Sequence, residues 1–552
     1  MTEYYNLGDH SRDVSTASLE AQRWFDRGLV WTYGFNHDEA IRCFEHALEH
    51  DPGCAMAHWG IAYAIGPNYN KPWEAFDEDD LTASLARAHD SVNRAVALSD
   101  RVSSVERDLI GALQSRYQSA QPVPLEELTR WNDDYADAMR DVYQRHEDDL
   151  DVTSLFAEAL LNRTPWDLWD LETRGIREGA STEEATQVLE RALDRTESRR
   201  HPGVLHMYIH LMEMSPHPER ALRACDWLRG LVPDAGHLQH MPTHIDVLCG
   251  HYDDVVASNN EAIKADRRFL RREGAMNFYS LYRSHNYHFK LYGAMFLGQL
   301  ETALEAAGEL ERTIPEDLLR VESPPMADWL EAFVPMRIHV LVRFGRWADL
   351  INLELPADQE LFAVTTAMTH YGKGVAFSAT GRIPEAEDQQ HLFEEAFSRV
   401  PDTRFLFNNS CLDILAIARE MLYGELEYRK ENYDLAFEHL RKAVELDDGL
   451  PYDEPWGWMQ PTRHALGALL LEQNRIEEAE AVYRADLGLD DSLARPYQNP
   501  DNVWSLHGYH ECLTRLGKNA EAAIIGQRLV LAEARADVPV QASCACRTSA
   551  VA

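Results

Sequence analysis

The sequence predicts an all-α protein in which helix–turn–helix hairpins stack into an irregular solenoid, curled around a central cavity. A pattern of small and aromatic residues recurs along the chain at about the spacing of one helical hairpin. Apolar residues make up 45% and charged residues 26% of the 552 positions, which is typical of a soluble globular protein. A single hairpin of this kind cannot bury its apolar face alone, so the hairpins must stack.

The clearest repeat is the stretch RWFDRGLVWTYGFNHDEAIRCFEHALEHDP, residues 23–52. We expect Gly28 and Ala40 where two antiparallel helices touch, because both residues are small. Phe44 would fill the space between the helices, and Pro52 would lie just beyond the second one. This stretch resembles the tetratricopeptide repeat (TPR) family, whose unit is a helix–turn–helix of about 34 residues.

The pattern of the second helix of the hairpin recurs at several places along the chain. The last matching segment has the pattern of the first helix of a hairpin. The matching segments are residues 215–234, 251–266, 298–316, 381–396, 432–447, 474–490 and 504–523. We therefore expect a lead-in over 1–19 and one TPR-like repeat domain over 20–534, with the predicted metal-site repeats at about 200–300. The remaining segment, 535–552, is predicted to be a disordered tail.

Charge and composition exclude several classes of partner. A net charge of −39 would repel nucleic acid and anionic membrane surfaces. The sequence contains no apolar run long enough to cross a bilayer, and its polar start does not resemble a secretory signal. We therefore expect a cytoplasmic protein with reduced thiols. A soft-metal contact at the C-x-C pair, Cys544 and Cys546, is left open.

Histidines recur at fixed positions in three successive repeats. We align three successive repeats so that Ala221, Val255 and Ala303 each occupy repeat position 20. Seven of the nine residues at repeat positions 2, 5 and 9 are then histidine. These seven are His206, His210, His237, His240, His244, His285 and His288. Positions three and four residues apart share one face of a helix. As the TPR resemblance implies, that face lines the concave groove in which ligands bind.

A proline interrupts the expected first helix of one of these repeats. Pro242 is expected to begin its helix near residue 241, which would leave His237 and His240 on the entering loop. The imidazoles would still meet in space, although not on a single helix face.

A cluster of imidazoles indicates a metal site. Neutral imidazoles packed together have few mutual hydrogen-bond partners, and protonating them creates repulsion, whereas a bound cation removes both problems. Nitrogen-only ligation suits copper, zinc, nickel or iron. Seven imidazoles exceed the three or four that one ion takes. We therefore predict two copper ions, with zinc or iron as alternatives. The ligand number and spacing are similar to those of type 3 copper proteins, which activate dioxygen.

Carboxylates beside the cluster are candidate catalytic groups. Glu213 follows His210 on the same helix, where it would orient a ligand or act as a base. Glu158 and Asn162 are spaced so that both would face the groove. A late repeat adds side chains that would close the groove over a small molecule, namely His464, Trp456 and Trp458.

The sequence thus predicts a histidine-ligated, dinuclear metal enzyme that oxidises a small molecule with dioxygen. Two alternatives remain open at this point: a non-catalytic adaptor that binds a partner peptide in its concave groove, and a zinc-dependent hydrolase. A protein partner or a homodimer is compatible with either. Adaptor grooves are usually lined by Asn, Lys and Arg, whereas histidine occupies the central positions here.

Overall fold

The computed structural model describes residues 4–548, and within them the chain forms two compact units. Unit 1 comprises the chain up to Ile245 together with Glu261–Tyr279. Unit 2 comprises Asp246–Asn260 and the chain from Ser280 onward. Two helices, α12 (Pro242–Leu248) and α13 (Tyr252–Glu273), pass from one unit to the other. Periodicity alone predicts one uninterrupted repeat domain, so this division is a feature that the sequence did not reveal.

Unit 1 is built from helices and one short hairpin. Its remaining α-helices are α1 (Leu19–Tyr33), α2 (His37–His50), α3 (Ala55–Ile65), α4 (Glu78–Leu98), α5 (Ser104–Leu113), α6 (Leu125–Arg145), α7 (Leu150–Leu161), α8 (Thr182–Leu193), α9 (Pro202–Glu213), α10 (Leu222–Leu228) and α11 (Gly236–His240). Its strands β1 (Trp169–Asp170) and β2 (Gly175–Ile176) pair antiparallel.

Unit 2 continues with the same kind of element. Its α-helices are α14 (Ser280–Leu297), α15 (Leu300–Thr313), α16 (Glu316–Leu319), α17 (Met326–Leu330), α18 (Met336–Arg343), α19 (Trp347–Ile351), α20 (Ala363–Ala379), α21 (Ile383–Phe397), α22 (Cys411–Arg429), α23 (Tyr433–Asp448), α24 (Thr462–Glu472), α25 (Ile476–Asp486), α26 (Val503–Arg515), α27 (Asn519–Glu533) and α28 (Ala545–Thr548). Strands β3 (Phe405–Leu406) and β4 (Asn409–Ser410) form its antiparallel hairpin.

One aromatic ring locks the first three helices of unit 1 together. A Cβ placed on Gly28 of α1 would lie 2.5 Å from Cε1 of Phe44, and one placed on Gly60 of α3 would lie 2.6 Å from Cζ of the same ring. Side chains do not approach that closely, so only glycine fits on either side of Phe44. The ring is fully buried, as the repeat pattern predicts.

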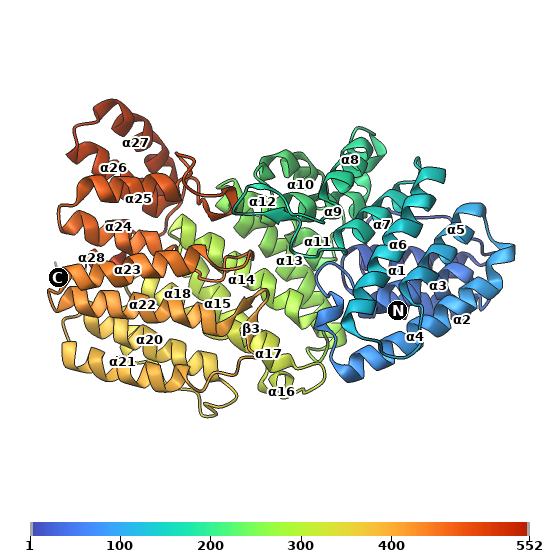
Figure 1. Cartoon of the computed structure of the whole chain (residues 1–552), viewed down its shortest axis with the longest axis horizontal. Helices are drawn as coiled ribbons and strands as arrows, with labels where there is room; N and C mark the ends of the chain where they lie inside the picture. Colours follow the sequence, from blue (N-terminus) through green and yellow to red (C-terminus); the bar gives the residue numbers. More distant parts are fainter. Residues whose placement is uncertain (1–3, 549–552) are drawn as a thin grey trace. The chain divides into compact units, whose positions relative to one another are not determined.

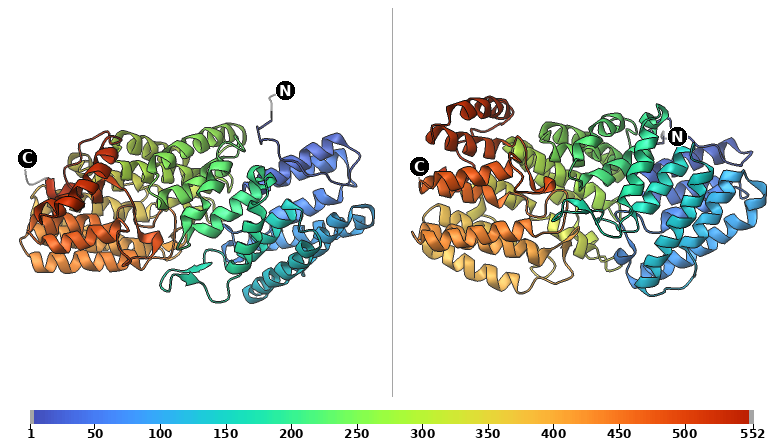
Figure 2. Two further views of the ribbon diagram at one scale, coloured as in Figure 1. Left: turned by 90° about the horizontal axis from the view of Figure 1, so that it is seen from above. Right: turned by 45° about the horizontal axis from the view of Figure 1, so that its top comes forward.

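The same arrangement recurs in unit 2. The ring of Tyr483 on α25 lies between Gly467 of α24 and Gly508 of α26. The hairpins α20–α21 and α22–α23 pack side by side next to α24–α25 (Figure 1), and their helices run nearly parallel in the further views (Figure 2). Each hairpin buries its apolar face against the next one, as a stacked repeat requires.

The two ends of the described chain are tied down. In the lead-in, the Tyr4 hydroxyl donates to Glu39 at 2.7 Å, and Arg12 pairs with Asp149 at 2.8 Å. The tail predicted to be disordered from 535 is instead ordered as far as Thr548, because buried side chains such as Ser543 anchor it in unit 2. The rest of the predicted tail, 549–552, lies outside the described residues.

Two further expectations from the sequence meet the structure. Cys544 and Cys546 form a disulfide, so the expectation of reduced thiols is wrong for this pair. Among the described residues, no helix is both long enough and apolar enough to span a lipid bilayer.

Candidate metal centre

Helix α9 carries two of the predicted ligands one turn apart. Pro202 stands at its first position, where a missing N–H costs nothing, and the His201 side chain accepts the Val204 N–H as a cap. His206 and His210 then project from the same side, and both are completely buried. The helix is buried on all sides, so these imidazoles lie in the interior of unit 1 and not on a solvated face.

Three more predicted ligands surround the break at Pro242. The helix does start anew at Pro242, as predicted, and His244 lies on it. The expectation of an entering loop was wrong, because residues 236–240 form the short helix α11 and carry His237 and His240. The break lets these imidazoles approach from a different direction than a continuous helix would allow.

The five imidazoles of unit 1 converge. Ring centroids are 4.7 Å apart for His206 and His210, and 4.9 Å apart for His206 and His237. The His240 and His244 rings are 4.8 Å apart. One ring nitrogen from each of His206, His210 and His237 lies within 4.8 Å of the other two. Nitrogens on one tetrahedral ion lie roughly 3.3 Å apart for bonds of about 2.05 Å, so small side-chain rotations would bring these three onto one ion.

The hydrogen bonds of α9 set its histidine tautomers. Nδ1 of His206 lies 2.7 Å from the backbone oxygen of Tyr33, and Nδ1 of His210 lies 3.0 Å from Oε1 of Glu213. Both partners are acceptors, so each Nδ1 carries the proton and each Nε2 keeps its lone pair. Within residues 4–548, these two buried Nε2 atoms have no hydrogen-bond partner. They are available as metal ligands.

Glu213 links the two ligand helices. Its second oxygen lies 2.8 Å from Nδ1 of His244, so one buried carboxylate faces Nδ1 atoms from both α9 and α12. Nε2 of His244 in turn lies 2.9 Å from Nε2 of His240. These two facing Nε2 atoms cannot both be donors, so at least one of them presents a lone pair to the other ring. A shared proton or a shared cation satisfies such a pair of nitrogens.

Burial keeps the cluster in the ligand form. Desolvation lowers the pKa of His206, His210 and His237 well below the usual value, and neighbouring imidazoles lower it further. These rings are therefore neutral at pH 7, which is the state that binds metals. Burial raises the pKa of Glu213, and the nearby His244 opposes that rise.

Aromatic rings form the wall around the cluster, and sequence reasoning missed them. Phe35 stacks on His210 with an interplanar angle of 15° and on His237 with an angle of 22°. Its φ of +53° is unusual for a residue with a side chain, and it directs the ring toward the imidazoles. Tyr69 lies 4.7 Å from His210. The single signal in the sequence is that Phe35 falls in the turn of the first repeat.

The other two predicted ligands belong to unit 2. His285 and His288 lie on α14, with ring centroids 6.5 Å apart. Nε2 of His288 lies 2.8 Å from Sδ of Met459, and its ring packs edge-on against Phe333. Metal binding by these two residues stays a prediction.

The second predicted catalytic carboxylate is buried but bonded elsewhere. Oε1 of Glu158 accepts a hydrogen bond of 3.1 Å from Asn162, and no hydrogen bond or ion pair joins it to a histidine in the described part of the chain. Burial raises the pKa of Glu158 to about 8, so it is protonated at pH 7 and is an acid rather than a base.

The late-repeat side chains have structural partners within unit 2. His464 pairs with Asp486 at 2.9 Å. Trp456 donates to Asp447 at 3.0 Å, and Trp458 packs edge-on against His339.

A second histidine group in unit 1 escaped the sequence reasoning. His10 and His201 each place Nε2 3.0 Å from Oδ1 of Asp151. Because Nδ1 of His201 accepts the backbone N–H of Val204, its Nε2 carries the proton, and the ring cannot bind a metal through that atom. This group is a hydrogen-bonded anchor for the lead-in.

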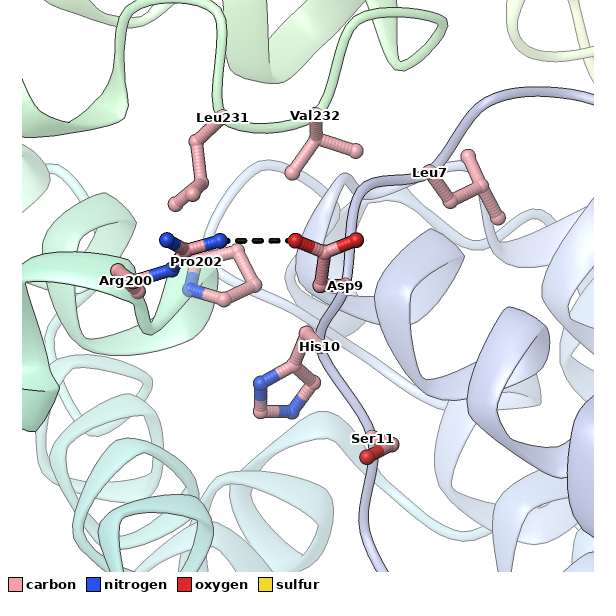
Figure 3. A pocket seen from close by; sticks show the side chains of 8 residues that line it. All are labelled: Leu7, Asp9, His10, Ser11, Arg200, Pro202, Leu231 and Val232. Carbon is pink, nitrogen blue, oxygen red and sulfur yellow. Dashed lines mark hydrogen bonds and ion pairs between the residues drawn. The ribbon is translucent and has the colours of Figure 1, made fainter.

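His10 also borders a pocket of about 200 Å³ in unit 1. Figure 3 shows the imidazole below Pro202, with the ion pair between Arg200 and Asp9 above it. The pair is solvent-exposed and 2.8 Å long.

Comparison with known proteins adds little beyond the fold. Neither a protein-family model nor a curated protein sequence matches this chain. The similar solved structures are yeast Tom70 (12% identity, 92% of this chain and 96% of that chain, TM-score 0.30), Naa15/Naa10 bound to HypK-THB (14%, 93% and 70%, 0.22), and a monomeric mutant of IFIT1 with Gppp-AAAA (13%, 86% and 90%, 0.35). Scores this low support no inference about function.

Proposed function

We propose that unit 1 binds metal through the imidazoles of α9, α11 and α12. His206, His210 and His237 would hold one ion. His240 and His244 would supply two of the ligands of a second ion, which would complete its coordination with water or substrate. Glu213 would fix the tautomer of His210, and its second oxygen lies 2.8 Å from Nδ1 of His244.

One observation carries this proposal. Two fully buried nitrogens, Nε2 of His206 and Nε2 of His210, present lone pairs to a common centre without a hydrogen-bond partner among the described residues. Leaving a buried polar atom unsatisfied costs about 1–3 kcal/mol. A bound metal ion would accept both lone pairs and so remove that free-energy cost. This supports the proposal that the site binds a cation.

The proposed activity is oxidation of a small molecule by dioxygen at two copper ions. Copper bound by these imidazoles would supply redox chemistry between its +1 and +2 states, and a substrate that loses two electrons and two protons would reduce dioxygen to hydrogen peroxide. Nitrogen ligation suits copper, and the apolar wall of Phe35 and Tyr69 would exclude water from the reaction. Glu158, protonated at pH 7, would act as a proton donor if the substrate reaches it.

Burial speaks against the adaptor alternative at this site. The cluster imidazoles are at most 2% exposed in unit 1, whereas a groove that grips a peptide must present its lining to solvent. A zinc ion on the same ligands would instead favour hydrolysis, because zinc is redox-inert and activates water. The identity of the metal therefore decides between the oxidase and the hydrolase.

Elemental analysis tests the proposal. Protein purified without a metal-affinity tag should contain about one or two ions of copper, zinc or iron per chain, since one ion takes three or four imidazoles. His206→Ala and His210→Ala should each remove most of the metal. His217→Ala removes an exposed imidazole from the same unit and should leave the metal content unchanged. Metal-free wild-type protein whose melting temperature does not rise with any added ion would refute the proposal.

A further inference from the structure

The last residues of the described chain occupy one face of unit 2. This first-helix face is defined here as the surface formed by α18, α20, α22, α24 and α26, the first helices of successive hairpins. The C-terminal segment, residues 542–547, lies on it, and α28 packs against α24 (Figure 1).

A serine anchors the segment in the face. Ser543 is 1% exposed. Its hydroxyl lies 2.5 Å from the Tyr483 hydroxyl and donates to the backbone oxygen of His464 at 2.8 Å. Nη1 of Arg343 donates to the backbone oxygen of Ser543 at 3.3 Å. Unit 2 thus makes hydrogen bonds to both a side chain and the main chain of the segment, as a peptide-binding surface does.

Steric fit restricts the segment to small residues. A Cβ placed on Gly345 would lie 2.8 Å from Cβ of Ala545, and Gly345 has a φ of +62°, which only glycine adopts easily. Cys546 is buried among the apolar residues of the last three hairpins. The cavity that remains beside Cys544 and Cys546 measures about 30 Å³, room for about one or two water molecules.

A charge pair closes the contact. The Arg547 guanidinium makes two hydrogen bonds to Glu511 of α26, at 2.6 and 2.9 Å. Arg429 of α22 donates to the backbone oxygen of Cys546. A basic residue suits this end of the face, since the chain as a whole carries a net charge of −39.

The connection to the solenoid is exposed along much of its length, although it is hydrogen-bonded to the start of α15. Between the end of α27 and Ala542, residues 534, 535, 537, 539 and 541 are exposed. The main anchor of this connector is Asp537, whose carboxylate accepts the backbone N–H groups of Leu300 and Glu301 at 2.7 and 2.9 Å and caps α15. The segment beyond it is held by the first-helix face, by Tyr483 of α25 and by Gly345 in the turn after α18.

We propose that residues 542–547 are an internal peptide ligand that covers a binding face for an extended segment of a partner protein. The partner segment would carry a hydroxyl residue in the Ser543 position, small residues after it and a basic residue in the Arg547 position. Partner binding would require the tail to leave. A short tether gives an internal ligand an effective concentration of about millimolar, so the free face is exposed only a small part of the time.

A chain that ends at Val538 tests this proposal. It keeps the Asp537 cap and loses the segment. A fluorescein-labelled peptide of residues 539–548 should bind the shortened chain in a fluorescence-anisotropy titration, and should bind the full chain at least tenfold more weakly. In the shortened chain, Glu511→Arg should weaken binding at least threefold, and a peptide with Arg547→Glu should restore it. Glu438→Arg, an exposed charge reversal on α23, should change nothing.

Full-length protein provides a second variant. Ala545→Trp cannot fit against Gly345, so it should displace the segment and allow the labelled peptide to bind as it does to the shortened chain. The proposal is overturned if the shortened chain binds no peptide, or if the full chain binds equally well. Loss of helical circular dichroism in the shortened chain would also overturn it, because the segment would then be part of the fold. A full-length dimer that dissociates when the chain is shortened would also overturn it, because the C-terminal segment of one copy would then bind the other copy.

Discussion

Replacing Glu213 with glutamine tests the geometry of the candidate metal centre. The carboxylate faces Nδ1 of His210 at 3.0 Å with one oxygen and Nδ1 of His244 at 2.8 Å with the other. Glutamine has the same shape but offers one oxygen and one NH₂ group, and the NH₂ group cannot accept an N–H. A glutamine whose NH₂ group faces Nδ1 of His210 forces that ring to move its proton from Nδ1 to Nε2. That histidine can no longer bind metal through Nε2.

The expected loss follows from the ligand that is removed. Changing a residue that orients a metal-binding histidine costs about 10–100-fold in metal affinity. This corresponds to about 1.4–2.8 kcal/mol. The negative charge that balances the cation disappears as well, so we expect the upper part of this range. Metal-free protein should keep its stability within about 1 kcal/mol, because a neutral amide buried in place of a carboxylate removes a desolvation cost.

Competition with a chromophoric chelator measures the affinity, and circular dichroism checks the fold. Glu219→Gln is the matched control, since Glu219 is an exposed carboxylate a few residues farther along the chain. If Glu213→Gln retains the wild-type affinity within threefold while metal still binds at His206 and His210, the assignment of the tautomers to Glu213 is wrong.

Two further predictions concern stability. Asp151→Asn should lower the free energy of unfolding by about 3–5 kcal/mol in urea titrations at pH 7, because it leaves the buried Arg12 guanidinium without one carboxylate partner. Burial alone would raise the pKa of Asp151, but hydrogen bonds from His10 and His201 lower it well below its usual value. The stabilisation by Asp151 is therefore fully present above its unfolded pKa of about 3.9 and is lost as the pH falls through its folded pKa. The difference in unfolding free energy between wild type and Asp151→Asn should consequently shrink below about pH 3.9. A difference that stays constant there contradicts the charge argument. Gly60→Ala should destabilise the protein by about 1–3 kcal/mol, because the added Cβ would meet Phe44. Gly111→Ala on α5 should stabilise it by about 0.5–1 kcal/mol, because nothing lies within 4 Å of the added Cβ. Equal shifts in melting temperature for the two variants would refute the packing account.

Much of the fold could be predicted from the sequence because it depends on local periodicity. Gly28 on α1 and Ala40 and Phe44 on α2 are buried where two helices touch, as the repeat pattern predicts. The division at α12 and α13 could not be predicted, since it depends on which hairpins contact each other. The tail is a similar case: its small polar residues look disordered alone, and a buried site for Ser543 exists only once distant helices have assembled.

The candidate site shows the same limit. The sequence by itself determined the fold class and placed His206 and His210 one turn apart on a helix, because both follow from a period of 3.6 residues. The repeat register also predicted His237 in the same cluster. Only the tertiary structure decided how closely its ring approaches His206, that Glu213 faces imidazoles of two helices and that Phe35 covers the group. These are contacts between segments far apart in the chain. Their geometry depends on how helices pack, and local sequence does not encode it.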